Sequence, residues 1–418
     1  MSYQRTIEWL YALEARAGMD FRLERLYGVL DRLGNPQLEF PAVHLVGTNG
    51  KGSTAAMLHS VYHTAGYRVG LYTSPHLVSF RERIVVGGRR IERDAVVRHV
   101  EEIRRAADAA NVSLTFFEIA TLTALLEFRD ARVDLAVVEA GLGGRLDATN
   151  VVQSVATVLT SVGRDHEAYL GDRIEGIAAE KVAVVREKGT LVSGPLPVEA
   201  LAVVRERVRR TGAVWLHYGR DFGPSEAVRP GGAGPGLRGA HQRRNAGVAT
   251  AVVGALADRF PVAAEVRDRA LANTRWPGRL EVFEGQPRVI ADAAHNPQAA
   301  ACLREALSPL LASGKVVLLF GVMADKDWRE MLCTLVPICD HVVLAPVAVG
   351  RSLDPRQALE VAAGLRMTTV ALSAGEGLDA AIAAAGRDGT VVVTGSIFLV
   401  GELYPRLCGH GGRGAAGG

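Results

Sequence analysis

The chain contains few cysteines, and none of them forms a metal-binding or redox pair. There are 4 cysteines in 418 residues, and no two are separated by only two residues. This excludes a disulfide framework and a zinc site of the Cys-x-x-Cys type as the basis of the fold. We interpret these thiols as reduced, as is typical of a cytosolic protein.

The sequence also lacks a signal-peptide core, an apolar run long enough to cross a bilayer, and an excess of charge of one sign. Lys and Arg number 48 and Asp and Glu 45, which gives a net charge of +3 and a pI near 8.7. A balance this even does not indicate nucleic-acid binding. We therefore expect a cytoplasmic protein, acting as a monomer, with neither nucleic acid nor membrane as a partner.

What the sequence does contain is enough apolar material for two folded domains. The hydrophobic content is 48%, and 418 residues exceed the size of one comfortable domain. Strands and helices alternate, which predicts an α/β fold. We expect a doubly wound, mostly parallel sheet of the P-loop type, followed by a smaller Rossmann-like α/β domain. The predicted bounds are residues 1–275, residues 276–408 and a disordered tail over 409–418.

A glycine-rich loop between a strand and a helix organises the first domain. Residues 42–46 form a short apolar run, the loop Gly47-Thr-Asn-Gly-Lys51-Gly-Ser53 follows, and a helical stretch continues from it. The first turn of a helix presents unpaired N–H groups and the positive end of the helix dipole, which suits a phosphate. Lys51 supplies a charge for the outer phosphates. The alternative is an ordinary tight turn without a ligand.

This loop departs from the strict Walker pattern in two places. Leu45 stands where the first glycine is expected, and Gly52 follows the lysine where a hydroxyl is expected. Because that hydroxyl usually binds magnesium, the ion needs a ligand from elsewhere in the chain.

Polar residues follow each further predicted strand of the first domain. The strands are expected at residues 68–72, 133–138 and 155–159, and they are followed by Thr73–Leu77, by Glu139 with the loop Gly141–Asn150, and by Asp165-His166. A helix over 172–187 carries Glu180 and Lys181. Open α/β sheets bind ligands at the carboxyl ends of their strands, so we expect these residues to lie around one site.

Helices are expected over 1–40, 92–110, 116–129 and 241–260, and residues 219–240 read as a flexible surface loop rich in Gly and Pro. Strands of the second domain are expected at 289–292, 315–320, 341–344, 367–372 and 390–394.

Taken in order, these motifs resemble the folylpolyglutamate synthase and dihydrofolate synthase family, part of the wider Mur-ligase group of ATP-dependent amide ligases. The matching segments, in the family's order, are Gly47–Ser53, Thr73–Leu77, Gly141–Asn150, Asp165-His166, Glu180-Lys181, His241–Ala246, Pro277-Gly278-Arg279, Asp292–Pro297 and Asp325-Lys-Asp327. One such motif is weak, but nine in the correct order are specific. The resemblance covers nearly the whole chain.

The resemblance implies that the chain joins the amine of L-glutamate to a carboxylate by way of an acyl phosphate made from ATP. The acceptor is dihydropteroate or a tetrahydrofolate that already carries glutamate. A carboxylate is a poor electrophile, and phosphorylation gives it a good leaving group. The protein then mainly positions reactants and neutralises charge.

The resemblance also assigns roles to individual residues. The residues that it implies for ATP are Thr48, Asn49, Gly50, Lys51, Gly52, Ser53, Asn245, Arg279 and Asp292. Those that it implies for magnesium, at two sites, are Ser74, Glu139 and His166, with room for a monovalent cation. Those that it implies for the pterin substrate are Thr115, Phe116, Phe117, Glu118, Leu146, Asp147 and Ala148. Lys51, Glu139, His166 and Lys181 are the expected catalytic residues, and Lys181 matches a lysine that is carbamylated in the family.

Several of these residues also have an ordinary structural interpretation. Phe116 could be a core aromatic as readily as a ligand contact, and His166 could be a satisfied structural histidine. An isolated lysine such as Lys181 is usually solvated on a helix face. His295 and Asn296 match the family near the second-domain residues without a defined role.

Two positions depart from the family's pattern. Val182-Ala-Val184 replaces the usual Ala-Gly-Ile after Lys181, and this puts carbamylation in question. Arg164 stands where an apolar residue is usual, so it either touches phosphate or points outward.

Three other functions are alternatives to the bifunctional ligase. A ligase that only extends polyglutamate tails differs only in the acceptor that it uses. A Mur-type ligase for a peptidoglycan precursor is disfavoured, because the short stretch before residue 47 is not expected to hold a nucleotide-sugar domain. A nucleotide-binding regulator would need no second domain contributing Arg279 and Asp292.

Overall fold

The computed structural model describes residues 2–16, 23–228, 236–311 and 314–410. The chain divides into two compact units. Unit 1 comprises residues 1–227 and 244–274, and unit 2 comprises 228–243 and 275–418. The boundary after residue 243 falls inside helix α9 (Ala240–Ala255), so residues 228–243, which we assigned to the first domain, group with unit 2.

Unit 1 is built on an eight-stranded sheet in the order β4-β3-β2-β5-β1-β6-β7-β8. All neighbours are parallel except the pairs β2–β3 and β3–β4. The strands are β1 Ala42–Val46, β2 Val69–Tyr72, β3 Ile84–Val86, β4 Arg89–Arg90, β5 Leu135–Glu139, β6 Ser154–Leu159, β7 Thr190–Ser193 and β8 Val214–His217. β5 and β6 follow one another in the chain but flank β1 on opposite sides, which is the switch point where such sheets bind ligands.

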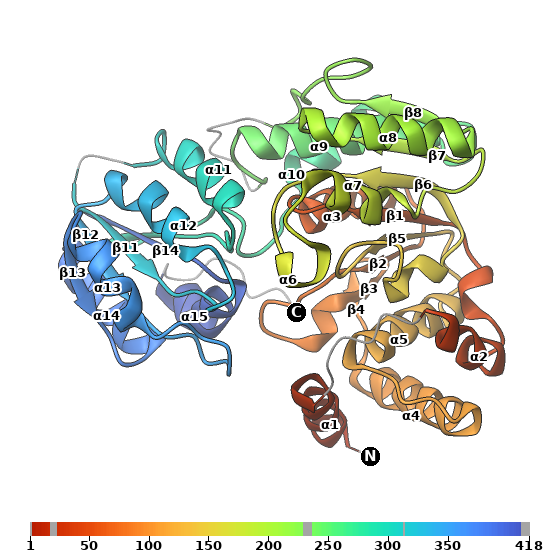
Figure 1. Cartoon of the computed structure of the whole chain (residues 1–418), viewed down its shortest axis with the longest axis horizontal. Coiled ribbons are helices and arrows are strands. Elements are labelled where there is room, and N and C mark those ends of the chain that lie inside the picture. The colour runs from red at the N-terminus through yellow and green to blue at the C-terminus, as the bar shows by residue number, and fades with distance from the viewer. Residues whose placement is uncertain (1, 17–22, 229–235, 312–313, 411–418) are drawn as a thin grey trace. The chain divides into compact units, whose positions relative to one another are not determined.

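Helices cover both faces of this sheet (Figure 1). They are α1 Tyr3–Arg16, α2 Glu24–Arg32, α3 Lys51–Thr64, α4 Arg93–Ala110, α5 Phe116–Asp130, α6 Glu167–Leu170, α7 Ile174–Val182, α8 Val198–Thr211, α10 Ala264–Asn273 and most of α9, with short 3-10 turns at Pro36–Leu38, Phe80–Arg83 and Ala148–Val151. α3 packs on β1, β2 and β5, and α10 packs on α3.

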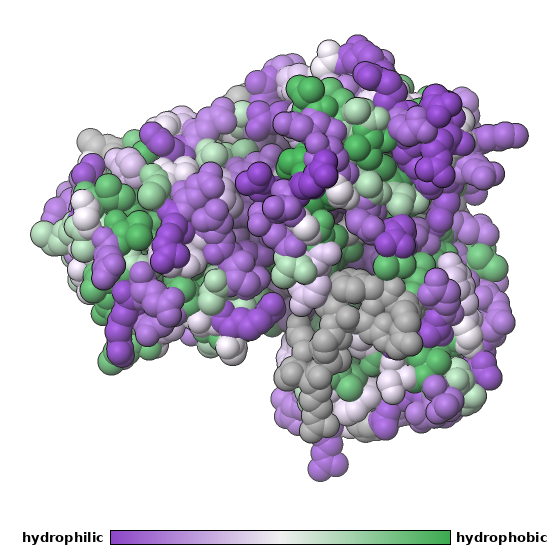
Figure 2. All heavy atoms as spheres, in the orientation of Figure 1, coloured by the Kyte–Doolittle hydropathy of each residue, from purple (hydrophilic) through white to green (hydrophobic). Residues whose placement is uncertain are grey.

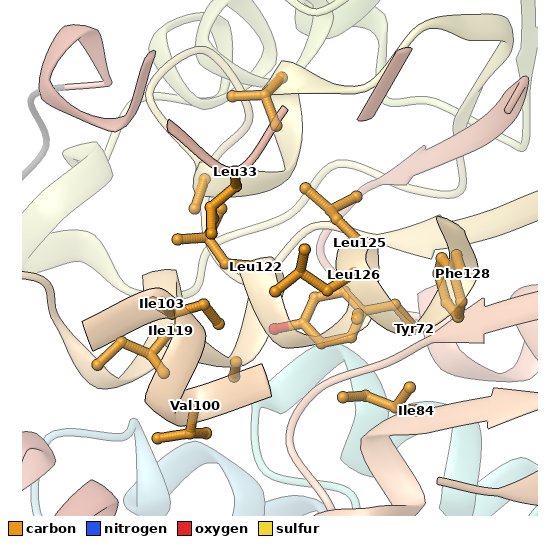
Figure 3. Close-up of a cluster of buried hydrophobic side chains, with 14 of the residues drawn as sticks. Leu33, Tyr72, Ile84, Val100, Ile103, Ile119, Leu122, Leu125, Leu126 and Phe128 are labelled. Carbon is orange, nitrogen blue, oxygen red and sulfur yellow. The ribbon is translucent and has the colours of Figure 1, made fainter. Parts of the chain in front are cut away.

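A large apolar cluster fixes α4 and α5 against β2. Figure 3 shows side chains of α5 between Val100 and Ile103 of α4 on one side and Tyr72 of β2 and Ile84 of β3 on the other. Phe128, Leu122 and Leu126 are fully buried, and each such side chain contributes about 1.5–3 kcal/mol to folding. This cluster therefore anchors the amino end of α5, where Thr115–Glu118 begin the helix. Hydrophilic residues cover most of the face seen in Figure 2.

Unit 2 is built on a six-stranded sheet in the order β13-β12-β11-β14-β10-β9, in which only β9 is antiparallel to its neighbour. The strands are β9 Glu281–Phe283, β10 Arg288–Ala291, β11 Val316–Phe320, β12 His341–Leu344, β13 Met367–Val370 and β14 Thr390–Thr394. The helices are α11 Pro297–Leu307, α12 Trp328–Leu335, α13 Pro355–Ala363, α14 Ala374–Ala385 and α15 Ile397–His410, with a 3-10 turn at Val336–Ile338.

The α/β fold and the parallel central strands agree with the prediction, and some element bounds do not. The helix expected over 172–187 ends at Val182, after which Val184 and Val185 turn into the core beneath the sheet. α15 runs to His410, so Gly409 and His410 are helical and do not belong to a tail. Residues 411–418 of the expected tail and 229–235 of the expected loop lie outside the described residues. Within the described ranges, no helix combines the length and apolar character needed to span a membrane.

Candidate active site

The glycine-rich loop lies between β1 and α3 and needs glycine at two positions. A Cβ atom at Gly47 would lie 2.0 Å from Oγ1 of Thr160, and the backbone φ there is +150°. Gly50 has a φ of +86°, and a Cβ atom there would lie 2.7 Å from Oδ1 of Asn245. The loop therefore packs against a strand-end loop on one side and α9 on the other, and no larger residue fits either position.

Side chains that follow β6 brace this loop through hydrogen bonds. The carbonyl oxygen of Asn49 accepts from Oγ1 of Thr160 at 2.7 Å and from Oγ of Ser161 at 3.0 Å, and Oγ of Ser161 accepts from the Asn49 amide at 2.9 Å. Oγ1 of Thr48 donates to the Gly163 carbonyl and accepts from the Gly163 amide, each at 3.0 Å. These hydrogen bonds fix the main chain of the phosphate loop.

Two lysine ammonium groups meet at the Gly47 carbonyl. Nζ of Lys51, in the first turn of α3 with Gly52 and Ser53, donates to it at 3.0 Å, and so does Nζ of Lys181 from α7, also at 3.0 Å. Lys181 is only 4% exposed. Burial and the charge of Lys51 lower the pKa of Lys181 to about 7, against the opposing influence of Asp165 and Asp147. Lys181 is therefore not the solvated surface lysine that its residue type alone suggests.

Glu139 and Ser74, two of the residues expected to bind magnesium, contact each other beside the loop. Glu139 ends β5 and is 4% exposed, and its Oε2 accepts from the Ser74 amide at 3.2 Å. Mg²⁺ is commonly held by one or two carboxylates with substrate phosphates and water, so the buried carboxylate of Glu139 is of the ligand type that suits it. Among the described residues, no group of three or more His, Cys, Asp or Glu side chains is placed to hold a metal by itself.

His166 lies at the start of the short helix α6 with a left-handed φ of +54°. Its amide donates to Oδ1 of Asp165 at 2.9 Å, and Asp165 raises the pKa of Lys181. The loop after β6 therefore carries Asp165 toward Lys181. Arg164 is exposed on the same loop.

The second glycine-rich loop is ordered around the buried carboxylate of Asp147. Oδ1 of Asp147 accepts from the amide of Thr149 at 3.0 Å and from its hydroxyl at 2.5 Å, and Oδ2 accepts from the Leu142 amide at 2.8 Å. Burial raises the pKa of Asp147 in spite of these bonds. Leu146 is partly buried next to it, and Ala148 is buried.

Thr115 and Glu118 form a capping box at the start of α5. Glu118 accepts from the Thr115 amide at 2.7 Å, while Thr115 Oγ1 accepts from the Glu118 amide at 3.3 Å. Glu118 also binds Nη2 of Arg25 at 2.7 Å. The Thr-x-x-Glu spacing is a signature of helix capping, so this structural role could have been predicted from the sequence.

The two phenylalanines of this segment have different surroundings. Phe116 is 5% exposed and belongs to the core cluster, with its ring edge-on to Phe80. Phe117 is half-buried, and a Cβ atom at Gly141 would lie 2.5 Å from Cζ of its ring. Phe117 therefore packs directly on the second glycine-rich loop, whereas Phe116 has a packing role.

The candidate residues of unit 2 flank the antiparallel pair β9–β10. Asp292 follows β10 and accepts from the amides of Leu280 at 2.8 Å and Ala294 at 2.9 Å. Burial raises the pKa of Asp292, and the charge of Arg279 opposes that rise. Glu281 accepts from the Gly278 amide at 2.8 Å, which fixes the other end of the Arg279 turn. Asn296 caps α11 by accepting from the Ala299 amide at 2.9 Å, and Nδ1 of His295 contacts the Ala293 carbonyl oxygen at 2.9 Å.

Sequence reasoning missed Thr160 and Ser161, which brace the phosphate loop. A usable signal was present, since two hydroxyl residues directly follow a strand that was expected to lie beside the loop. Serine and threonine are common residues with many roles, so their type alone does not indicate that they hold a phosphate loop.

Comparison with known proteins defines first a class and then a family. The sequence model of the Mur ligase middle domain matches residues 45–193, and that of the Mur ligase glutamate ligase domain matches residues 278–397. The chain is thus a ligase of the Mur type in both of these segments.

Closer relatives narrow this class. The folylpolyglutamate synthase of Lacticaseibacillus casei is 34% identical over 98% of this chain and 99% of its own. The dihydrofolate synthase/folylpolyglutamate synthase of Escherichia coli is 35% identical over 94% of each chain. The structure of Escherichia coli FolC in complex with DHPP and ADP superposes with a TM-score of 0.87 at 32% identity, covering 97% of this chain and 98% of that one. The chain belongs to the folylpolyglutamate synthase/dihydrofolate synthase family.

Proposed function

We propose that this chain is an ATP-dependent ligase that adds L-glutamate to dihydropteroate and to reduced folates that already carry glutamate. One observation carries the proposal: the braced phosphate loop with Lys51 lies beside Glu139 and Ser74, at the ends of adjacent strands. A charged lysine and a buried carboxylate in this arrangement suit a nucleotide and its magnesium ion. Membership of the family, whose Escherichia coli member was solved with DHPP and ADP, supports the substrates.

The reaction then proceeds in two steps. A carboxylate oxygen of the acceptor attacks the γ-phosphorus of ATP, ADP leaves, and an acyl phosphate forms. The glutamate amine attacks the acyl carbon, the tetrahedral intermediate expels phosphate, and the amine loses a proton to give the amide. Lys51 balances the charge on the transferring phosphoryl group, which is the main need of this chemistry.

Ser74, Glu139 and His166 would hold magnesium, which supplies positive charge to the phosphate oxygens. Lys181 would act as its carbamate. With a pKa of about 7, a large share of its amine is neutral at physiological pH, and a neutral amine is the form that adds CO₂. The carbamate would turn two adjacent cations at the Gly47 carbonyl into an ion pair.

Phe117, Leu146, Asp147 and Ala148 are proposed to contact the pterin, and Asn245, Arg279 and Asp292 to contact ATP. For Thr115, Phe116 and Glu118 the proposed contact is indirect, because capping, core packing and the Arg25 ion pair already occupy these side chains.

The direct test uses purified protein with ATP, magnesium and glutamate, together with either dihydropteroate or tetrahydrofolate. We expect each acceptor to gain the mass of one glutamyl residue for each phosphate released. If only tetrahydrofolate gains glutamate and dihydropteroate does not, the chain is a ligase that only extends polyglutamate tails. Phosphate release that needs neither acceptor nor glutamate would identify a nucleotide-binding regulator instead.

Replacing Asp147 should separate the two activities. Asp147→Ala is expected to reduce the use of dihydropteroate about 100-fold and tail extension less than 10-fold, because a polar site discriminates strongly when one partner is lost. Thr149→Val is the matched control, since it removes a loop hydrogen bond to Asp147 but keeps the carboxylate. Equal losses of both activities in Asp147→Ala would mean that Asp147 acts only through the loop.

A further inference from the structure

A cavity lies in unit 1, at the ends of the strands opposite to those that carry the phosphate loop. Its volume is about 660 Å³, within the range of small-molecule sites. Its walls are residues 38–41, which lead into β1, residues 150–155, which lead into β6, and the side chains of Tyr27, Arg186 and Arg259. Since the phosphate loop follows the carboxyl end of β1, the cavity at the amino ends of β1 and β6 is a separate site.

Arg186 is held rigidly in the wall of this cavity. Its Nη2 donates to the Asn150 carbonyl at 2.5 Å, to Oδ1 of Asn150 at 2.9 Å and to the Val152 carbonyl at 3.2 Å. In the described part of the chain, its Nε and Nη1 make no hydrogen bond or ion pair. Burial lowers the pKa of Arg186, so the protein only partly compensates its charge. A fixed guanidinium with unused donors is suited to bind an anion.

Arg259 supplies a second, uncommitted guanidinium. It is exposed, and its Cζ lies 5.4 Å from the centroid of the Phe260 ring. Within the described ranges the guanidinium of Arg259 forms no hydrogen bond or ion pair, and its one printed contact is with the Phe260 ring. Among the described residues that line the cavity, Glu39 alone carries a carboxylate and it is exposed, so the wall holds two guanidinium groups and one carboxylate. The cavity is therefore positively charged and attracts anions.

An aromatic side chain gives the cavity an apolar wall. Tyr27 lies on the exposed side of helix α2, is 49% exposed and lines the cavity, whereas Leu26, Val29 and Leu30 of the same helix are buried. An exposed aromatic beside two arginines is the combination that binds a flat organic anion through both its charge and its body.

We propose that this cavity binds a small organic anion, a carboxylate or phosphate on a flat apolar body, with Arg186 and Arg259 as the anion donors and Tyr27 as the contact for the body. The site goes beyond the proposed ligase reaction and does not depend on it, since none of these three side chains is proposed to contact ATP, metal or pterin. β1 and β6 connect the cavity with the phosphate loop and with Thr160 and Ser161 that brace it.

The test compares anions with a neutral molecule of the same shape. Benzoate, phenyl phosphate and benzamide are titrated into the protein by calorimetry, with the phosphate loop saturated by magnesium and ADP. We expect benzoate or phenyl phosphate to bind at least 10-fold more tightly than benzamide, because a charge-assisted bond is lost with the amide. Stronger binding of phenyl phosphate would identify a phosphate ligand, and stronger binding of benzoate a carboxylate.

Two variants locate the binding. Arg259→Gln should weaken binding of the anion about 10-fold without affecting the fold, because the guanidinium of Arg259 has no hydrogen bond or ion pair in the described structure. Arg89→Gln, which removes an exposed arginine on β4 at the far edge of the sheet, should leave the affinity unchanged. Equal binding of benzoate and benzamide, unchanged affinity in Arg259→Gln, or no binding up to about 10 mM would each overturn the proposal.

Discussion

The two units position their candidate site residues in different ways. In unit 1 the residues follow the carboxyl ends of parallel strands, and side chains from a neighbouring loop fix the main chain of the phosphate loop. In unit 2 Arg279 and Asp292 flank an antiparallel pair at the sheet edge, and carboxylates of the same segment hold the turn. Unit 1 thus offers a preformed cradle of backbone groups, whereas unit 2 offers a single guanidinium on a fixed turn.

This difference has a consequence for where transition-state stabilisation arises. A preorganised cradle acts on developing charge without rearrangement and is usually the largest single contribution to such catalysis. One guanidinium beside a buried carboxylate adds mainly to binding. Unit 1 should therefore dominate the rate, and unit 2 the affinity for ATP.

The strongest test of this comparison is Lys51→Ala against Arg279→Ala. We expect Lys51→Ala to lower the rate of ligation by about 10³-fold, since the outer phosphates lose their charge partner in the transition state. Arg279→Ala should raise the KM for ATP about 10-fold with a smaller loss of kcat. Single-turnover and steady-state assays separate these effects, and Lys315→Ala, which alters an exposed lysine of unit 2, is the control. Near-normal turnover in Lys51→Ala would contradict the assignment of the phosphate loop.

The next largest effect concerns Lys181 and CO₂. At a fixed concentration of dissolved CO₂, activation should grow as pH rises from 6 to 8, because the pKa of about 7 means that the ammonium form gives way to the neutral amine over this interval. Lys181→Arg keeps a positive charge but cannot form a carbamate, and we expect it to lose about 100-fold in rate and all dependence on CO₂.

A spectroscopic readout distinguishes carbamylation from a purely structural role for Lys181. Protein equilibrated with ¹³C-labelled CO₂ should show a carbamate carbon signal that is absent from Lys181→Arg. Absence of this signal from wild-type protein at pH 8 would contradict carbamylation of Lys181. The reason would then be Val182, which is bulkier than the usual alanine, is only 2% exposed and leaves no room for the carbamate.

The metal ligands are expected to have an intermediate effect. Glu139→Gln and His166→Ala should each raise the magnesium concentration needed for half-maximal rate by about 10-fold or more, since each removes an expected ligand. Glu167→Gln changes the exposed neighbour of His166 and serves as the control. An unchanged magnesium titration in both variants would mean that Glu139 does not bind magnesium and only holds the Ser74 segment in place.

Much of the fold was predictable because the buried parallel strands are continuous apolar runs. The strands at Ala42–Val46, His341–Leu344 and Thr390–Thr394 fall where expected. The short strands β3, β4, β7, β8 and β9 were not predicted. Of these, β4, β8 and β9 are edge strands, in which β4 has exposed polar residues and Val214 of β8 is 60% exposed. Edge strands bury little surface, so their sequences carry little periodic signal.

The candidate site was predictable only where the residue type and its local spacing by themselves indicate a chemical role. The glycines and Lys51 do so from sequence alone, but Lys181 depends on burial, which no single-sequence pattern reveals. For Glu118 the opposite holds. The resemblance to the family suggested a substrate contact, whereas the local Thr-x-x-Glu spacing already indicated the capping box that the structure contains. Residues held by long-range contacts, such as Thr160, become recognisable only once the strands are in register.

The smallest expected effect on the rate comes from the side chains that brace the phosphate loop, as distinct from the loop itself. Ser161→Ala removes one donor to the Asn49 carbonyl and the acceptor of the Asn49 amide, while the bond from Thr160 remains. Because the bond from Thr160 and the two bonds between Thr48 and Gly163 survive, we expect a loss in kcat of about 3- to 10-fold with little change in unfolding temperature. Glu281→Gln is the equivalent change in unit 2, where it weakens the bond to the Gly278 amide and the 3.0 Å bond from the Tyr404 hydroxyl. If the comparison of the two units is correct, Ser161→Ala lowers kcat and Glu281→Gln raises the KM for ATP. The same pattern in both variants would mean that the two units contribute to the reaction in the same way.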